Sequence, residues 1–249
     1  MGRIQFQYVP RTVPAPGIWI KIYPMRKLFN HASKLRNAMM LITTSHRPTR
    51  RTRSFGHDLE RVFPNSLYLT RGKKTIQDLL MEAYDRNYER LLIINVWKGN
   101  PLKMTFIKVD PDDWGYLGYL YLHGIKLQRE IGFRNLRPIR EEMPFVVTTA
   151  KRVGIDHTAF AQAFAELTGG KFVPRGNKSL QTIADKNNTD VIGVIENYPR
   201  GMAINFYRFD VTKERPVGPL ILVKIWIMED GRRWDYKEAL LRKSGQSRE

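Results

Sequence analysis

The sequence predicts an α/β fold built from two copies of one unit, each running strand, helix, strand, helix and three further strands. Three ordered matches between the halves support this duplication. The segments "MLITTS" (40–45) and "FVVTTA" (145–150) align at an offset of 105, and "YLTRGKKTIQ" (68–77) meets "FVPRGNKSLQ" (172–181) at 104. A third set keeps an offset of 100: Phe106, Asp110 and Gly118 match Phe206, Asp210 and Gly218. Loop insertions produce small steps in offset, whereas chance matches would not keep their order.

The first copy is expected to begin with a short apolar strand at 41–45. A helix at about 53–63 follows, because Phe55, Leu59 and Val62 repeat at i, i+4 and i+7 and therefore share one face. The remaining elements are listed in order: a strand at 67–70, a helix at 75–86, and strands at 91–96, 103–109 and 118–127.

The second copy repeats this pattern with the same helix spacing. Its helix at 156–167 places Phe160, Phe164 and Leu167 at the positions of the three apolar residues in the first copy. The other elements are listed in order: strands at 145–149 and 171–174, a helix at 179–187, and strands at 191–196, 202–209 and 219–227.

Candidate caps mark where the helices begin. Asp156 is the expected N-cap of the helix in the second copy, and Thr52 or Ser54 that of its counterpart in the first. Thr75 and Ser179 are available to cap the two shorter helices. Strand–helix–strand–helix–strand order predicts parallel pairing with right-handed crossovers, closed by an antiparallel pair.

Composition points to a globular protein that attracts polyanions. The 249 residues are 42% hydrophobic and 27% charged, and no apolar run is long enough to cross a bilayer, so we expect a cytoplasmic protein without a membrane partner. Without cysteine there can be no disulfide, thiol nucleophile or cysteine-ligated metal. The 42 basic and 24 acidic residues give a net charge of +18, which favours nucleic acid as partner.

Four arginines lie within seven positions just before or at the start of the first helix. Arg47, Arg50, Arg51 and Arg53 therefore reach a helix N-terminus, where unpaired N–H groups and the helix dipole already favour an anion. Phosphate is the natural ligand, since arginine binds it with two parallel hydrogen bonds. The alternative is a solvated loop of a heat-adapted protein. Residues 47–74 hold eight basic and two acidic side chains, a net of +6.

The segments "RGKKT" (71–75) and "RGNKS" (175–179) place a glycine between basic residues where a strand gives way to a helix. They add Arg71, Lys73, Lys74, Arg175 and Lys178 to the candidate anion ligands. The glycine also has a plain structural interpretation, a turn that needs positive φ. Because parallel strands end at one edge of a sheet, the loops after the first three strands of a copy should bring these cations together.

Other motifs indicate little chemistry. The histidines show no ligand spacing, "LTGGKF" (167–172) is not a phosphate loop, and "DPDDW" (110–114) is best interpreted as a turn. We therefore expect no catalytic residue, no metal and no cofactor. Aromatic residues such as Trp97, Trp114 and Tyr119 could stack on bases, but aromatics on strands are more often core, so none is assigned to RNA.

The stretch "LITTSHRPTRRTRSFGHDLERVFP" (41–64), followed by "YLTRGKKTIQDL" (68–79), resembles the signature of Brix-domain proteins, most closely that of the short archaeal members. It is also similar to the sigma-factor-like motif described for that family. The resemblance covers about residues 40–230. It implies a non-catalytic ribosome biogenesis protein that binds ribosomal RNA or its precursor, with ribosomal or assembly-factor proteins as further partners. Each half would resemble the anticodon-binding domain of class II aminoacyl-tRNA synthetases.

Carried over residue by residue, the resemblance assigns RNA contact to Arg47, Arg50, Arg51 and Arg53, and also to Arg71 and Lys74. The second copy has "AKRVGIDHTAF" (150–160) in place of the arginine run, which argues against two equivalent RNA sites. Two other functions stay open at this point: a scaffold for acidic protein partners within a ribonucleoprotein, and a tRNA-binding module. A nucleotide-dependent enzyme would need a phosphate loop or metal ligands that the sequence lacks.

The expected domain is residues 39–230, with halves 39–143 and 144–230, followed by a C-terminal tail at 231–249. Residues 1–38 carry seven basic residues, no acidic residue and four prolines. They are expected to be either a basic arm, disordered by composition, or an over-extended reading frame, and their removal should leave the fold intact.

Overall fold

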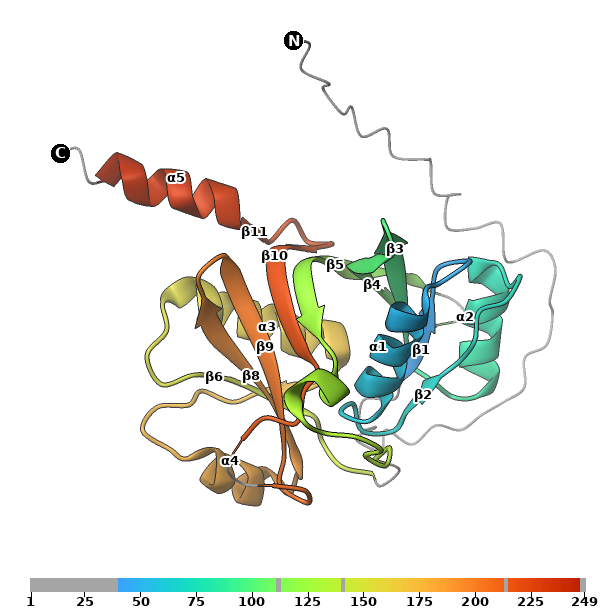
Figure 1. Cartoon of the computed structure of the whole chain (residues 1–249), viewed down its shortest axis with the longest axis horizontal. Helices are drawn as coiled ribbons and strands as arrows, with labels where there is room; N and C mark the ends of the chain where they lie inside the picture. The colour runs from blue at the N-terminus through green and yellow to red at the C-terminus, as the bar shows by residue number, and fades with distance from the viewer. Residues whose placement is uncertain (1–39, 111–112, 140–141, 213–214, 247–249) are drawn as a thin grey trace, which may run out of the picture. The chain divides into compact units, whose positions relative to one another are not determined.

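The computed structural model of the chain describes residues 40–110, 113–139, 142–212 and 215–246, without the side chains of 242–246. The described residues form one mixed sheet of eleven strands with helices on it (Figure 1). The strand order is β2-β1-β3-β4-β5-β10-β9-β8-β6-β7, and β11 pairs with β10. The expected α/β class is therefore confirmed. The predictions for residues 1–38 lie outside the described residues.

The expected elements of the first half are all present, with ends shifted by a few residues. They are β1 (Met40–Thr44), α1 (Arg50–Glu60), β2 (Ser66–Tyr68), α2 (Ile76–Asp85), β3 (Arg90–Trp97), β4 (Asn100–Lys108) and β5 (Gly115–Lys126). A short 3-10 helix, η2 (Gln128–Ile131), follows β5.

The second half contains the same series of elements. They are β6 (Val146–Thr149), α3 (Ile155–Thr168), β7 (Lys171–Phe172), α4 (Leu180–Asn187), β8 (Val191–Tyr198), β9 (Gly201–Arg208) and β10 (Leu220–Met228). The predicted C-terminal tail contains β11 (Arg233–Asp235) and α5 (Tyr236–Gln246). No helix among the described residues is long and apolar enough to span a membrane.

Strand pairing follows the expected pattern in both halves. β1 pairs in parallel with β2 and β3, and β3, β4 and β5 continue antiparallel. In the second half β6 pairs in parallel with β7 and β8, and β8, β9 and β10 continue antiparallel. The antiparallel pair β5–β10 joins the halves into one sheet.

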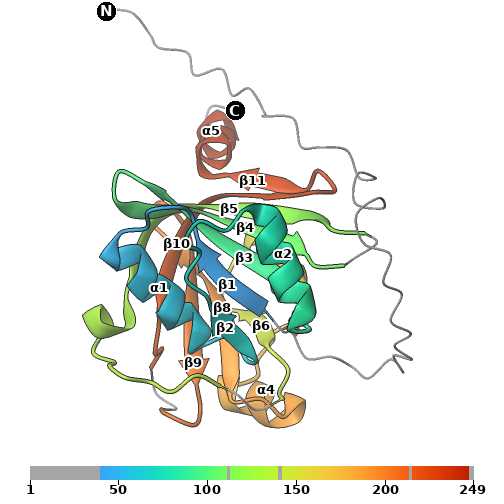
Figure 2. The same ribbon diagram turned by 90° about the vertical axis from the view of Figure 1, so that its right-hand side faces the viewer.

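Successive strand residues face opposite sides of the sheet, which gives each side its own apolar layer. Ile42 packs with the α1 residues Phe55 and Leu59 in a core that also takes in α3, whereas its neighbour Leu41 packs with Leu79 of α2. Figure 2 shows α1 and α2 on either side of β1. The six apolar residues predicted to line the paired helices are all fully buried: Phe55, Leu59, Val62, Phe160, Phe164 and Leu167.

Two of the predicted N-caps are wrong. α1 begins at Arg50, with Thr49 as N-cap, because the Thr49 hydroxyl accepts a hydrogen bond from the N–H of Thr52; neither Thr52 nor Ser54 is the cap. α3 begins at Ile155 after Gly154, which offers no side chain for a cap, and Asp156 lies in the first turn. The predicted caps of the shorter helices are confirmed at Thr75 and Ser179.

Candidate nucleic-acid interface

The loops that follow β1, β2 and β3 lie together at one edge of the sheet, as parallel pairing requires. The Nδ1 atom of His46, in the loop after β1, lies 3.2 Å from the carbonyl oxygen of Gly72, in the loop after β2. The hydroxyl of Thr49 donates to the carbonyl of Gly99, in the turn after β3, over 2.8 Å. We call this surface, carried by residues 45–53, 70–75 and 98–99, the arginine edge. It is a connected surface because these contacts join its three loops.

Three of the four arginines in the loop after β1 and the first turn of α1 are exposed. Arg47, Arg50 and Arg53 are exposed, and Arg47 has a left-handed backbone with φ of 56°. Arg53 donates to the carbonyl of Pro48 over 3.3 Å, whereas Arg47 and Arg50 have no hydrogen bond or ion pair to any residue that the structure describes. The first turn of α1 contains no acidic residue. These guanidinium groups therefore flank a helix N-terminus, and no carboxylate of the described residues forms an ion pair with them.

Arg51 is placed differently from its three neighbours. Its Nη2 atom donates to Oε2 of Glu130 over 3.0 Å and to the carbonyl of Ile125 over 3.0 Å, and its Nη1 atom bonds the other carboxylate oxygen of Glu130. The hydrogen bond from Arg51 lowers the pKa of the Glu130 carboxyl, helped by a bond from the N–H of Leu127. Arg51 thus already has a carboxylate partner within the protein.

In the "RGKKT" turn, two of the basic side chains are bonded within the protein and one is exposed. Arg71 is only 8% exposed; its Nε donates to the carbonyl of Lys74 over 3.1 Å, and burial lowers its pKa. The Nζ atom of Lys74 lies 3.2 Å from a carboxylate oxygen of Glu82. Lys73 is exposed. Of these three candidates, Lys73 is the one that presents its charge to solvent without a described carboxylate partner.

The "RGNKS" turn of the second half has the same internal geometry. The Nε of Arg175 donates to the carbonyl of Lys178 over 3.1 Å, as Arg71 does to Lys74. Gly72 and Gly176 have φ of 59° and 51°, and a Cβ added at either would meet nothing within 4 Å. The expectation that these glycines serve a positive φ is therefore confirmed, and the reason is backbone conformation rather than lack of room. Lys178 is exposed, whereas Arg175 is half-buried.

The matching edge of the second half is in contact with the C-terminal segment. Trp234 of β11 donates from Nε1 to the Asp156 carboxylate, in the first turn of α3, over 3.2 Å. The hydroxyl of Tyr236 donates to the carbonyl of Pro199, in the turn after β8, over 2.9 Å. In the second half, β11 and the start of α5 therefore contact the edge that corresponds to the arginine edge of the first half.

Trp97 departs from the expectation that aromatic residues on strands belong to the core. It is the last residue of β3 and is 60% exposed, because the chain turns back directly after it at Lys98 and Gly99. Its ring belongs to the same end of the sheet as the arginine edge. The sequence carried no signal that would separate Trp97 from the partly buried aromatics of β5.

Curated relatives decide the family. No protein-family model matches the chain. A probable Brix domain-containing ribosomal biogenesis protein of Thermococcus kodakarensis is 95% identical over 202 residues, which cover 81% of this chain and 97% of the relative. The chain belongs to this family. A member from Methanopyrus kandleri is 35% identical over 192 residues, which cover 77% of this chain and 96% of that protein.

Solved structures agree with the fold of this Brix-domain protein. The crystal structure of a probable ribosomal biogenesis protein from Aeropyrum pernix K1 matches with a TM-score of 0.61 and 26% identity, over 75% of this chain and 96% of that one. Mil, an archaeal Imp4-like protein, matches with a TM-score of 0.51 and 22% identity, over 76% and 99% of the two chains. The second likeness shows the fold alone.

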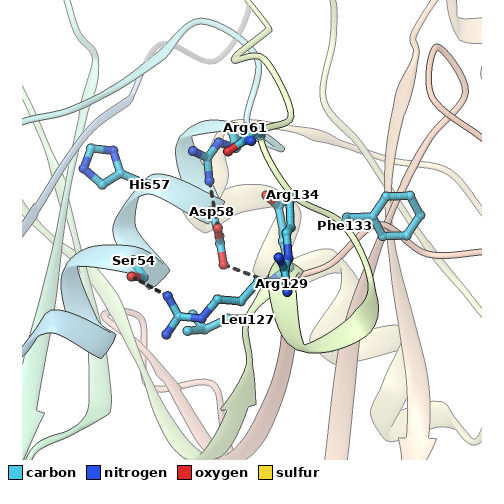
Figure 3. A pocket seen from close by; sticks show the side chains of 10 residues that line it. Ser54, His57, Asp58, Arg61, Leu127, Arg129, Phe133 and Arg134 are labelled. Carbon is cyan, nitrogen blue, oxygen red and sulfur yellow. Dashed lines mark hydrogen bonds and ion pairs between the residues drawn. The ribbon is translucent and has the colours of Figure 1, made fainter.

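The described part of this Brix-domain protein offers no group of three or more His, Cys, Asp or Glu residues arranged to hold a metal ion. The basic residues that the sequence interpretation missed are Arg129 and Arg134, which line a cavity beside α1 (Figure 3). The signal for them was present in the arginine-rich segment "LQREIGFRNLR" (127–137), which follows the last strand of the first half.

Proposed function

We propose that this protein is a non-catalytic RNA-binding ribosome biogenesis factor that acts in ribosomal RNA precursor processing and subunit assembly. The arginine edge binds RNA phosphates through the exposed side chains of Arg47, Arg50, Arg53 and Lys73. The observation that carries the proposal is the set of exposed guanidinium groups, without described carboxylate partners, at the N-terminus of α1.

Physical chemistry favours RNA phosphate as the ligand of this edge. Arginine forms bidentate hydrogen bonds with phosphate, and backbone N–H groups of a helix N-terminus add to the same attraction. A net charge of +18 steers polyanions toward the protein before any specific contact forms. Exposed Trp97 offers a ring on which an unpaired base could stack, a contact that tolerates any base.

The proposed domain is residues 39–230, with halves 39–143 and 144–230. The matching strand order of the two halves supports an internal duplication, and so do the matching hydrogen bonds of Thr43 to Leu69 and of Thr148 to Val173. The likeness of each half to an anticodon-binding domain belongs to the same proposal. RNA contact is concentrated in the first half, since the second half lacks the arginine run and its edge touches β11 and α5.

The proposal is tested by titrating a ribosomal RNA precursor fragment against the wild type and the triple variant Arg47→Ala, Arg50→Ala, Arg53→Ala. The matched control is Arg86→Ala, Lys186→Ala, Lys237→Ala, which removes three exposed charges elsewhere. Both variants carry +15, from 18 − 3, so global charge is held equal. The edge variant should lose at least about tenfold in affinity at about 200 mM salt while the control changes little. Equal losses in the two variants would show that the edge has no special role.

A further inference from the structure

A cavity of about 360 Å³ opens between the exposed side of α1 and the segment that follows β5. Figure 3 shows its side chains: Ser54, His57, Asp58 and Arg61 come from α1 or its C-cap, and Arg129 and Arg134 from the facing segment. The volume equals that of ~12 water molecules and lies at the lower end of the range for ligand pockets. It is large enough to receive one phosphate with its sugar.

The charges that line the cavity are mostly positive. Asp58 is the acidic residue of the lining, and its carboxylate is buried, accepting hydrogen bonds from Arg61 Nη1 over 3.0 Å and from the N–H of Gln128 over 2.9 Å. Burial raises the pKa of this carboxyl, although both hydrogen bonds oppose the rise. Three guanidinium groups and one carboxylate leave a net charge of +2 on the lining, from 3 − 1.

Two of the three guanidinium groups have no carboxylate partner among the described residues. Arg129 donates from Nη1 to the hydroxyl of Ser54 over 3.2 Å, and Arg134 is exposed without a described hydrogen bond or ion pair. The nearby carboxylate of Glu130 forms its ion pair with Arg51, and Arg129 attracts this carboxylate and that of Asp58 without forming an ion pair with either. Two planar donors beside a hydroxyl, neither in an ion pair with a described carboxylate, suit an anion with several acceptor oxygens.

We propose that this cavity binds a phosphodiester group of RNA, with Arg129 and Arg134 as its main contacts and the Ser54 hydroxyl as a further donor. The inference rests on the proposed RNA-binding function and extends it to a second, separate site. The backbone of the bound strand runs from the arginine edge along the exposed face of α1 into the cavity.

The geometry of α1 supports this path. Arg50, Ser54, His57 and Arg61 follow one another at i, i+4, i+7 and i+11 and therefore lie on one face of the helix axis. Phe55 and Leu59 occupy the opposite, buried face. Eleven residues of helix span about 16 Å, so the path from Arg50 to the cavity takes in several phosphates of an RNA strand.

The test adds a cavity variant, Arg129→Ala with Arg134→Ala, to the titrations with the ribosomal RNA precursor fragment. Its matched control is Arg86→Ala with Lys186→Ala. Loss of two phosphate contacts should reduce the slope of log K against log salt by about 1.4 for single-stranded RNA, whereas the control leaves it unchanged. Circular dichroism melts establish that each variant is folded. Arg129→Lys with Arg134→Lys keeps the charges, so it should retain the slope while losing affinity.

Each outcome separates this inference from the proposed function. If the cavity variant lowers the slope and the edge variant does not, RNA binds at the cavity and the arginine edge is a solvated surface. If the edge variant alone lowers the slope, the proposed function stands and the cavity inference is overturned. If the folded cavity variant and its control behave alike, Arg129 and Arg134 do not contact phosphate.

Discussion

Arg51 and Glu130 form a two-point ion pair across 79 residues of sequence, with Nη2 and Oε2 3.0 Å apart. The pair ties the first turn of α1 to the segment after β5, and Arg51 adds a bond to the carbonyl of Ile125. One arginine of the basic run thus stabilises the fold, although the other three, Arg47, Arg50 and Arg53, are exposed.

Replacing Arg51 by Ala should destabilise the protein by about 1–2 kcal/mol, because the change removes the ion pair and leaves the carbonyl of Ile125 without this donor. Arg50→Ala is the matched control, since Arg50 is exposed and should change stability by less than about 0.5 kcal/mol. Denaturant unfolding of both variants measures the difference. Equal stabilities would mean that solvent screens the pair completely.

The ion pair between Arg51 and Glu130 should make the stability of the folded protein depend on pH. The pKa of Glu130 lies below its ordinary value of 4.5 in the folded protein, chiefly because Arg51 donates to it. A lowered folded pKa means that this stabilisation is fully present above about pH 4.5 and is lost as the pH falls through the folded pKa. The stability gap between the wild type and Glu130→Gln should therefore shrink in acid. If the difference in unfolding free energy between the two proteins stays constant down to the lowest pH at which both are folded, Glu130 does not have a lowered pKa in the folded protein.

Much of the fold is predictable from sequence because its signals are local. The spacing of Phe55, Leu59 and Val62 indicates the buried face of α1, and the glycine of "RGKKT" indicates a positive φ. The N-cap of α1 has no such unique signal, since Thr49, Thr52 and Ser54 are all suitable residues close together. Only the backbone geometry selects Thr49.

The role of each basic residue is what the sequence could not predict. Arg47 and Arg51 lie in one run, yet one is exposed and the other is paired with a residue far along the chain. Arg71 and Arg208 are buried, and both bond backbone carbonyl oxygens. Whether an arginine stabilises the fold or stays free to bind a ligand depends on partners far away in the sequence. A single sequence does not reveal these partners.

Arg208 should be the arginine whose loss is most damaging. It is 4% exposed, and its Nη1 atom donates to the carbonyl oxygens of Arg61 and Arg137 over 2.9 and 2.6 Å. Arg208→Leu leaves these carbonyls and the Asp210 carboxylate without their donor, so we expect a loss of about 3–5 kcal/mol. Arg215→Leu, at an exposed position, is the control for thermal unfolding. Similar melting of the two variants would show that water replaces Arg208.

Replacement by asparagine should affect the stability of the protein differently at Gly72 and at Gly56. Gly72→Ala costs about 1–2 kcal/mol because its φ is positive, and Gly72→Asn should cost less because asparagine tolerates that conformation. At Gly56 an added Cβ would lie 2.4 Å from the Tyr68 ring, so both replacements should cost about 1–3 kcal/mol or more, asparagine the more of the two. Unfolding free energies of the four variants provide the comparison. The opposite order at Gly72 would contradict the backbone explanation.

The division of roles within the arginine run yields a final expectation for RNA binding. If Arg47, Arg50 and Arg53 each contact a phosphate, their joint replacement by Ala should reduce the slope of log K against log salt by about 2.1 for single-stranded RNA. Adding Arg51→Ala should leave that slope almost unchanged, since Arg51 binds Glu130, but should lower the melting temperature. Titration of a ribosomal RNA precursor fragment at several salt concentrations, paired with melts of the same samples, separates the two effects. A further fall of about 0.7 in the slope on removing Arg51 would mean that this arginine leaves Glu130 and contacts phosphate when RNA binds.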